Sequence, residues 1–324
     1  MYPLLQHPNR FVWDFWYHYD TKDRLFHILY LNADPCLVAS QQHHFSARIG
    51  YAVTQDFTKI DWRSDNVFQA SEYSWDKYRW DNTSIWSGDM IKVRDGLLFY
   101  YTSRDQYVDD GMTQNIGLAF STDYLHWERV PSLRLRPDPR FYEPQSVQGD
   151  NTIHAWRDPF LFRASGEIYM LVSAKDPQQL IGRKGCIGLL RAINQSLTKW
   201  TALPPTYSPG WYSECEVPQL YHKNGQYLLT FSCAAKYDQS PYTLGQGGLV
   251  GVVGTSSRIE EPFSEPAHVL LAEASGLYAC RVIPELDGDI VGFDLQKGGW
   301  RRVPARTKLR SIDRDFSQTG LTDE

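Results

Sequence analysis

The chain has 324 residues, of which 42% are hydrophobic and 22% are charged, and its formal net charge is −5. This is the composition of an ordinary globular protein with a sizeable core, and an acidic balance without a long basic run argues against a nucleic-acid partner. No apolar stretch approaches the roughly 18 residues that a membrane-spanning helix needs, and the first residues lack the features of a signal peptide. We therefore expect a cytoplasmic protein without a membrane partner.

The cysteines and aromatic residues narrow the class further. Five cysteines at irregular spacing indicate neither a disulfide framework nor a zinc site. The 11 tryptophans and 20 tyrosines are typical of a β-rich core.

In chain order, the clearest pattern is a repeated strand, turn and tryptophan. It occurs at residues 49–62, 116–127 and 187–200, and a degenerate copy without the tryptophan occupies residues 250–263. The copies start between 63 and 71 residues apart. Self-similarity at such a period indicates an array of like structural units.

Further strands are expected ahead of each repeated strand. Apolar, aromatic segments bounded by Gly or Asp predict strands at residues 24–31, 96–102, 166–173 and 225–232. Shorter strands are expected before three of these segments, at residues 85–93, 159–163 and 218–222. Each unit then has four strands linked by turns and loops, which is the pattern of a propeller blade.

The period also predicts the number of blades. A chain of 324 residues holds five units of about 65 residues each. The fifth would lie at residues 276–300 and be completed by an N-terminal strand. We therefore predict an all-β protein, a single five-bladed β-propeller over residues 1–310 with four antiparallel strands per blade. Residues 311–324 are expected to form a polar C-terminal tail.

Three acidic residues, Asp14, Asp158 and Glu216, each lie in a motif framed by aromatic residues or proline. The motifs are Val-Trp-Asp-Phe-Trp (12–16), Trp-Arg-Asp-Pro (156–159) and Glu-Cys-Glu-Val-Pro (214–218). Each acid precedes the third strand of its unit by 29 to 35 residues, so all three belong at the same place on an innermost strand. Innermost strands line the central channel of a propeller, so the carboxylates should converge there. Singly, such an acid could instead cap a turn or form a structural ion pair, but the shared phase favours a common site.

Converging carboxylates suit the cleavage of glycosidic bonds. That reaction needs one carboxylate as nucleophile or base and one protonated carboxyl to assist the leaving group. Arg157 is expected to lower the pKa of Asp158 and keep it ionised, which suits the binding of sugar hydroxyls. Glu214, two residues before Glu216, should project to the same face. A second carboxylate nearby raises a pKa, as a general acid requires.

These motifs resemble those of five-bladed β-propeller glycosidases that act on fructosides, glycoside hydrolase families 32 and 68, and more distantly family 43. Residues 12–16 are similar to the nucleophile motif of family 68, and Trp86-Ser87-Gly88 resembles a stretch of its second blade. Arg157-Asp158-Pro159 matches the Arg-Asp-Pro that families 32 and 68 share. Residues 214–218 resemble both Glu-x-Glu-x-Pro of family 68 and Glu-Cys-Pro of family 32.

The resemblance implies a role for each residue. Asp14 would be the nucleophile, Asp158 would stabilise the transition state through fructosyl hydroxyls, and Glu216 would be the acid/base. The family 32 alignment points to Glu214 as acid/base instead, although Pro218 favours Glu216. Ser87 is expected to hydrogen-bond the nucleophile, and the aromatic walls of the pocket are expected to be Trp13, Trp16 and Trp86. The reaction needs no metal or organic cofactor.

The chain also departs from these families. The Asn-Asp-Pro-Asn-Gly motif of family 32 is absent, and Tyr17 stands where family 68 has a proline. Asp89 follows Trp86-Ser87-Gly88 and would place an extra carboxylate near the site. No room remains after about residue 310 for the C-terminal β-sandwich of family 32. The chain is thus expected to be an outlying member.

Three functions follow from this pattern. The first is a retaining β-fructofuranosidase acting on sucrose or fructo-oligosaccharides, with fructosyl transfer as an open alternative to hydrolysis. The second is an inverting arabinofuranosidase or xylosidase of family 43 type, against which the Arg-Asp-Pro motif argues. The third is a carbohydrate-binding propeller without catalysis, which the complete acid set disfavours. In each case the expected partner is a small sugar or an oligosaccharide.

Overall fold

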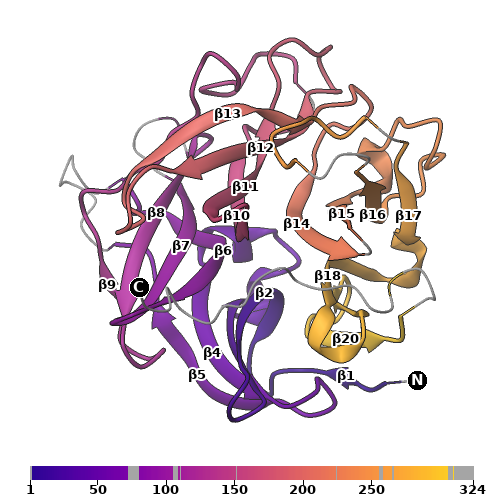
Figure 1. Ribbon diagram of the computed structural model, residues 1–324. Helices are drawn as coiled ribbons and strands as arrows, with labels where there is room; N and C mark the ends of the chain where they lie inside the picture. The colour runs from indigo at the N-terminus through magenta and orange to yellow at the C-terminus, as the bar shows by residue number, and fades with distance from the viewer. Residues whose placement is uncertain are drawn as a thin grey trace.

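The computed structural model describes residues 2–71, 80–104, 109, 111–150, 152–223, 225–254, 258–264, 266–305 and 309. In these residues, five four-stranded antiparallel sheets stand around a central channel like the blades of a propeller (Figure 1). The predicted all-β, five-bladed fold is confirmed. The described helices are short 3-10 turns, none of which could cross a membrane, at Pro35–Leu37, Gln42–Phe45, Ala235–Tyr237, Glu273–Ser275 and Pro284–Leu286.

Four blades are built from consecutive strands, with the first strand innermost. The first blade contains β2 (Phe11–Asp20), β3 (Leu25–Ala33), β4 (Arg48–Thr54) and β5 (Asp61–Phe68). The second contains β6 (Ser84–Val93), β7 (Gly96–Arg104), β8 (Gln114–Ser121) and β9 (Glu128–Arg129). The third contains β10 (Trp156–Ala164), β11 (Glu167–Lys175), β12 (Gly185–Ala192) and β13 (Trp200–Tyr207). The fourth contains β14 (Glu216–Lys223), β15 (Gln226–Cys233), β16 (Gly248–Val253) and β17 (His268–Leu271).

The fifth blade joins the two ends of the propeller chain. Its strands are β18 (Leu277–Ile283), β19 (Asp289–Asp294), β20 (Trp300–Val303) and, outermost, β1 (Leu4–Leu5). Leu4 pairs with Arg301 and Leu5 with Trp300, and Figure 1 shows β1 beside β20. The predicted completion by an N-terminal strand is therefore confirmed. The tail predicted at residues 311–324 lies outside the described residues.

Aromatic packing closes the ring between the last and first blades. Trp300 of β20 is completely buried, and its ring centroid lies 5.0 Å from that of Phe15 and 5.1 Å from that of Trp62. Burial of one large apolar side chain stabilises a fold by roughly 1.5–3 kcal/mol. Because Phe15 and Trp62 belong to the first blade, these contacts hold the two blades together.

Every innermost strand has a β-bulge at the same place. In β2, Val12 pairs with Asn32 and Phe15 with Tyr30, so two residues of β2 oppose the single residue Leu31. The same register shift occurs in β6, β10, β14 and β18. The residue pairs in the bulges are Trp13–Asp14, Trp86–Ser87, Asp158–Pro159, Val217–Pro218 and Ala279–Cys280. A bulge bends its strand and redirects side chains, and here it directs them to the channel.

The bulges correct the prediction that the three acids share one position in the repeat. Asp14 is the second residue of its bulge, Asp158 is the first, and Glu216 immediately precedes one. The acids therefore occupy neighbouring positions of the repeat rather than one equivalent position. Their side chains can consequently approach the channel from different heights and angles.

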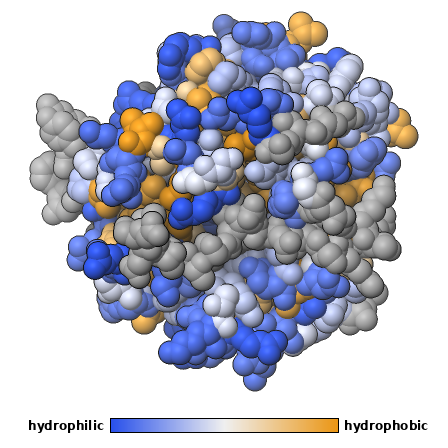
Figure 2. Space-filling model, viewed as in Figure 1, coloured by the Kyte–Doolittle hydropathy of each residue, from blue (hydrophilic) through white to orange (hydrophobic). Residues whose placement is uncertain are grey.

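The face shown in Figure 2 is mostly polar. Among the coloured residues of this view, apolar side chains are scattered in small groups. Leu180 and Leu244 are the most exposed large apolar side chains among the described residues. Isolated apolar residues are normal on protein surfaces, whereas the three predicted acids line a cavity in the channel.

Candidate active site

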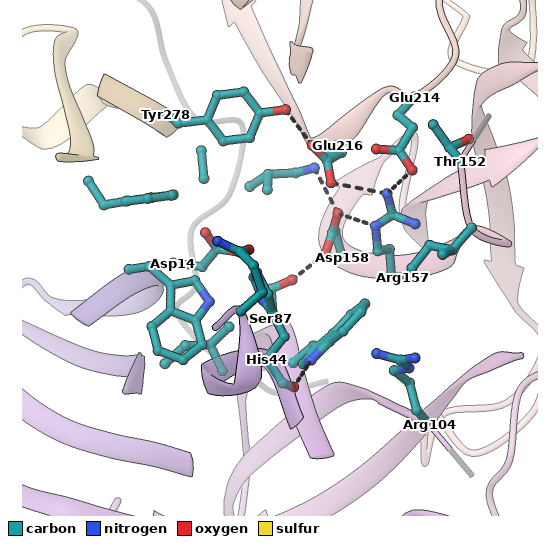
Figure 3. Close-up of a pocket in the computed structure, with 18 of the residues that line it drawn as sticks. Asp14, His44, Ser87, Arg104, Thr152, Arg157, Asp158, Glu214, Glu216 and Tyr278 are labelled. Carbon is teal, nitrogen blue, oxygen red and sulfur yellow. Dashed lines mark hydrogen bonds and ion pairs between the residues drawn. The ribbon is translucent and has the colours of Figure 1, made fainter. Parts of the chain in front are cut away.

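A cavity of about 660 Å³ lies in the channel. Each of the five innermost strands contributes to its lining at least one polar side chain at or beside the bulge, including Asp14, Ser87, Asp158, Glu216 and Tyr278. Figure 3 shows these side chains gathered around one space. The cavity continues between the loops that follow β3, β7 and β15, which add residues such as His44, Met112 and Tyr237.

Asp158 is held by hydrogen bonds on both carboxylate oxygens. The Ser87 hydroxyl donates to Oδ1, and the Val217 N–H donates to Oδ2 at 3.0 Å. The Asp158 N–H donates to Thr102 Oγ1 at 3.0 Å. Ser87 thus binds Asp158, and the prediction that it binds Asp14 is wrong. The cause is the bulge, which brings the Ser87 hydroxyl of the second blade against the Asp158 carboxylate of the third.

Asp158 also has an unusual backbone. Its φ is 57°, and the first bulge residues of the next two blades, Val217 and Ala279, have φ of 49° and 44°. A left-handed conformation costs a residue with a side chain roughly 1–2 kcal/mol. Strain of this kind persists only where the surrounding structure imposes it, and it is common at functional sites.

Arg157 lies at the centre of a charged cluster (Figure 3). Its Nη2 lies 2.9 Å from Glu214 Oε1 and 3.0 Å from Glu216 Oε1, and its Nε lies 3.6 Å from Asp158 Oδ2. Nη1 donates at 3.3 Å to Gln114 Oε1. Burial alone would lower the pKa of Arg157, but the three carboxylates outweigh it and raise that pKa. The planar guanidinium suits this arrangement because its donors form a rigid fork.

The expected effect of Arg157 on Asp158 is only partly correct. Arg157 does lower the pKa of Asp158, but burial raises it by more, and the charge of Glu216 adds to the increase. The net pKa lies above the ordinary value, so the prediction of a lowered pKa is wrong. Removal from water disfavours a charged carboxylate, and one shared cation does not fully compensate for it.

The two glutamates differ in their surroundings. β14 begins at Glu216, so Glu214 lies just before the strand rather than on it, yet both face Arg157. The Glu214 side chain is 9% exposed and that of Glu216 is 23% exposed. Burial raises the pKa of Glu214, while Arg157 and the buried Lys175 oppose that rise. Glu216 instead accepts a hydrogen bond from the Tyr278 hydroxyl on Oε2.

Asp14 lines the cavity beside these groups. Burial raises its pKa well above the ordinary value of 3.8, and the charges of Asp158 and Glu216 raise it further. Arg281 opposes the rise; its Nε donates to the carbonyl oxygen of Phe15, the residue after Asp14, at 2.5 Å. Asp14 is therefore a buried carboxyl group that binds its proton more tightly than an ordinary aspartate.

Only two of the three predicted aromatic walls line the cavity. Trp13 and Trp86 do so, and Trp86 Nε1 donates to the His44 carbonyl oxygen at 2.8 Å. Trp16 is completely buried and stacks on Phe99, with ring centroids 5.3 Å apart. The prediction that Trp16 walls the pocket is therefore wrong, because its side chain packs in the core between the first two blades.

Asp89 is a structural residue. It is 1% exposed, and its Oδ2 accepts the Leu161 N–H at 2.9 Å, which links β6 to β10. It does not line the cavity, so the predicted extra carboxylate at the site is wrong. Asp89 occupies the same position after the bulge as Trp16, and the three other blades have a buried apolar residue there, namely Leu161, Leu220 and Val282.

The sequence patterns did not identify several site residues. Tyr278 and Arg281 lie in the fifth blade, which has no acidic motif, although its bulge has the same phase as the others. Gln41, His44 and Phe45 come from the loop after β3, and Arg104 ends β7. These residues lack a framing motif, so only their folded positions reveal them.

Comparison with known proteins shows which family the chain resembles. Residues 50–248, more than half of its length, match the Glycosyl hydrolases family 32 N-terminal domain. A curated relative, the sucrose-6-phosphate hydrolase of Lactococcus lactis subsp. lactis, is 28% identical over 173 residues. That alignment covers 50% of this chain and 32% of the relative, about a third of its length.

Solved structures share the fold. The inulosucrase of Halalkalicoccus jeotgali bound to kestose has a TM-score of 0.70 at 20% identity, covering 90% of this chain and 79% of its own. The β-fructofuranosidase catalytic domain of Microbacterium saccharophilum K-1 has a TM-score of 0.67 at 18% identity, covering 93% and 78%. The levansucrase of Gluconacetobacter diazotrophicus has a TM-score of 0.67 at 20% identity, covering 96% and 82%.

The sequence match and the shared propeller agree with the motifs at the cavity. The matched segment contains the second and third blades and the first two strands of the fourth, including Arg157, Asp158 and both glutamates. The chain therefore belongs to glycosyl hydrolase family 32.

Proposed function

We propose that the protein is a retaining glycoside hydrolase that acts on β-fructofuranosides such as sucrose or fructo-oligosaccharides. Asp14 attacks the anomeric carbon, and Glu216 protonates the departing oxygen. The resulting fructosyl ester on Asp14 is then hydrolysed by water that Glu216 deprotonates. The observation that carries the proposal is the convergence of Asp14, Asp158 and Glu216 on one cavity around Arg157.

The assignment of the nucleophile follows from hydrogen bonding. Both oxygens of Asp158 already accept hydrogen bonds, from Ser87 and Val217. Among the described residues, none donates a hydrogen bond to the Asp14 carboxylate, which nevertheless lines the cavity. Asp14 is thus the carboxylate available for attack, and Asp158 is suited to accepting hydrogen bonds from fructosyl hydroxyls.

The assignment of the acid/base follows from the environment of the two glutamates. Glu214 binds Arg157 at 2.9 Å and is the more buried of the two. Glu216 is more exposed to the cavity and shares its two oxygens between Arg157 and the Tyr278 hydroxyl. A group that exchanges protons with substrate must reach it, which favours Glu216. Glu214 then serves to position Arg157.

The same ester could also pass its fructosyl group to a sugar. The solved structures that share the fold include an inulosucrase, a levansucrase and a β-fructofuranosidase. In this chain, an acceptor sugar that replaces water would turn hydrolysis into fructosyl transfer. Hydrolysis is the simpler proposal because water needs no acceptor subsite.

The proposal is tested with sucrose, inulin-type and levan-type oligosaccharides and with nitrophenyl arabinoside and xyloside, with all products resolved. Asp14→Asn and Glu216→Gln should each lower kcat on the fructosides by roughly three orders of magnitude or more, about 4 kcal/mol in the barrier. Denaturation of Glu216→Gln during turnover should release protein with a fructosyl adduct on Asp14. The control Asp89→Asn, outside the cavity, should retain kcat within a few-fold.

The stereochemistry of the first product separates the mechanisms. A retaining enzyme releases β-fructofuranose, which rapid NMR can detect before mutarotation. An inverted product, turnover of the arabinoside or xyloside alone, or wild-type kcat in Asp14→Asn would each overturn the proposal. Binding of fructosides without any turnover would identify a carbohydrate-binding propeller instead.

A further inference from the structure

Arg281 is a buried arginine of β18 at the seam between the fifth and first blades. It is 4% exposed, and its Nε donates to the Phe15 carbonyl oxygen at 2.5 Å. Its Cζ lies 6.0 Å from the centroid of the Phe15 ring. Phe15 follows Asp14 on β2, so the guanidinium lies against the backbone that carries the proposed nucleophile.

The position of Arg281 in its strand is defined by the bulge. Arg281 is the residue directly after the bulge of β18, and Phe15 is the residue directly after the bulge of β2. The same position holds Gly88, Phe160 and Gln219 in the other three blades. These four residues are uncharged, so among the described innermost strands the fifth blade alone brings a charge to this position.

The backbone around Arg281 is held by the fourth blade. Gln219 Nε2 donates to the Cys280 carbonyl oxygen at 3.0 Å, and the Tyr221 hydroxyl donates to the Val282 carbonyl oxygen at 2.8 Å. Cys280 and Val282 flank Arg281 in the chain. Since the Nε of Arg281 is bonded to the first blade, the guanidinium is fixed from both neighbouring blades before a substrate arrives.

The charge of Arg281 is not neutralised by an ion pair. Within the described part of the chain, its guanidinium makes one hydrogen bond, to the Phe15 carbonyl oxygen, and no carboxylate forms an ion pair with it. Arg157, by contrast, is shared among three carboxylates. A buried charge without a paired partner is costly, and local costs of this kind are expected at functional sites.

Asp14 is the carboxyl group on which this charge acts. Burial raises the pKa of Asp14, and the charges of Asp158 on β10 and Glu216 on β14 raise it further. Two cations oppose the rise, Arg281 on β18 and, to a smaller extent, Arg157 on β10. A carboxyl group attacks only when it is ionised. Without Arg281, Asp14 would therefore be protonated, and unable to attack, over a wider range of pH.

Two further titratable groups of the cavity are uncharged at neutral pH. Burial lowers the pKa of His44, from the loop after β3, to about 4. Burial raises the pKa of the Tyr278 hydroxyl well above its ordinary value. Neither group supplies Asp14 with a positive charge at neutral pH.

We propose that Arg281 is a positioning residue of the proposed reaction, whose buried positive charge keeps Asp14 ionised for attack. The inference rests on the proposed function, because it takes Asp14 as the nucleophile. Arg281 does not line the cavity, so it acts through Asp14 and not on the sugar. Its contribution to activity should therefore depend on pH, unlike that of a residue that only holds the seam together.

The kinetic test is the pH profile of kcat/KM on sucrose. Arg281→Gln removes the charge and keeps a hydrogen-bond donor, and the acidic limb of its profile should move to higher pH by about one unit or more. Its activity should then be about tenfold below wild type on the acidic limb and much closer to wild type on the plateau. Arg281→Lys keeps the charge and should return the limb to within about half a unit of wild type. A loss of equal size at every pH would overturn the proposal, since that is the result of a purely structural role.

Arg302→Gln is the matched control. Arg302 also joins the fifth blade to the first, because its Nη1 donates to the Asp56 carbonyl oxygen at 2.6 Å, and it also does not line the cavity. Its acidic limb should coincide with that of wild type. Urea unfolding shows whether each variant is folded. If Arg281→Gln does not fold, Arg281→Met is the second uncharged variant, for which we expect the same shift.

A titration without substrate makes the inference independent of turnover. Carbon-13 NMR of protein labelled at the aspartate Cγ follows Asp14 directly, and its signal is the one missing from Asp14→Asn. The titration midpoint of Asp14 should rise by about one pH unit or more in Arg281→Gln and stay unchanged in Arg302→Gln. An unchanged midpoint in Arg281→Gln would overturn the role of Arg281 while leaving the fructosidase proposal intact. Failure of wild type to cleave any fructoside would overturn the proposed function itself.

Discussion

Single residues set the charge of the site through pairing and burial. Arg157 binds Glu214 and Glu216 and lies 3.6 Å from Asp158. Within the described part of the chain Asp14 forms no ion pair, and its pKa is raised by burial and by its acidic neighbours. The nucleophile of the proposed reaction is therefore a carboxylate whose charged form is disfavoured by burial and by its acidic neighbours. Activity should fall as the pH drops through its raised pKa, at a higher pH than for an ordinary aspartate.

Asp14→Asn should make the protein more stable even as it removes activity. The folded-state pKa of Asp14 is raised, so folded protein binds this proton more tightly than unfolded protein does. That contribution is present below pH 3.8 and is lost as the pH rises through the raised pKa. Asparagine cannot ionise and avoids the loss. The stability gain of Asp14→Asn should thus be small near pH 4 and larger near pH 8, as measured by urea unfolding at about five pH values.

A surface substitution provides the comparison. Asp23→Asn, on the exposed turn between β2 and β3, should change the free energy of unfolding by less than about 0.5 kcal/mol at each pH. A gain for Asp14→Asn that is independent of pH, or a loss at pH 8, would contradict the argument that Asp14 is held in an unfavourable charged state.

At the scale of the element, the innermost strand with its bulge is the unit that builds the site. The prolines of two motifs, Pro159 and Pro218, occupy the second bulge position, where the ladder is interrupted. A residue without an N–H is tolerated there because no ladder bond is lost. The prolines of the sequence motifs thus mark bulges in the folded strands.

Gly88 shows how closely neighbouring strands approach at the bulge. A Cβ on Gly88 would lie 2.1 Å from the Tyr100 carbonyl oxygen, which is backbone and cannot move aside easily. Gly88→Ala should therefore destabilise the protein by roughly 1–3 kcal/mol or more and lower kcat, because Ser87 and its bond to Asp158 must shift. Thermal unfolding and steady-state kinetics measure the two effects.

Gly166→Ala separates steric from conformational cost. Gly166 has a φ of 82°, but no atom lies within 4 Å of an added Cβ. It should cost about 1–2 kcal/mol from backbone strain alone and leave kcat unchanged, since it lies in the turn between β10 and β11. If Gly88→Ala were as active as Gly166→Ala, the bulge of β6 would not be a rigid support for the site.

At the scale of the whole molecule, the ring must close for five strands to face one channel. Closure depends on β1 pairing with β20 and on Trp300, whose Nε1 donates to the Trp13 carbonyl oxygen at 2.7 Å. Trp13 is the residue before Asp14. The seam between the fifth and first blades is therefore connected directly to the proposed nucleophile.

Deletion of residues 1–6 should weaken this seam. It removes β1 and exposes the edge of β20, and unpaired edges favour association with other chains. We expect Tm to fall by roughly 5–10 °C, which corresponds to a few kcal/mol, together with self-association in light scattering. Gln6→Ala keeps β1 and loses only an exposed bond to the Lys297 carbonyl, so it should behave as wild type. An unchanged Tm after deletion would show that side-chain packing alone closes the ring.

Much of the fold can be predicted from the sequence alone because strand patterns are local. The repeat period, the strand sequence within each unit and the closing N-terminal strand are all encoded in short segments, and they predict five blades correctly. The placement of Asp14, Asp158 and Glu216 on innermost strands follows from the same period. Trp13 and Trp86 beside the cavity follow from their adjacency to those positions.

The tertiary structure decided what depends on side-chain direction and on distance through space. A bulge adds one residue to the strand and reverses which side later residues face, so Trp16 and Asp89, at one equivalent position, enter the core instead of the cavity. The ion pairs of Arg157 with Glu214 and Glu216 join residues brought together from different blades. Strand periodicity carries no information about such contacts, because it describes each strand separately and not the neighbours that ring closure provides.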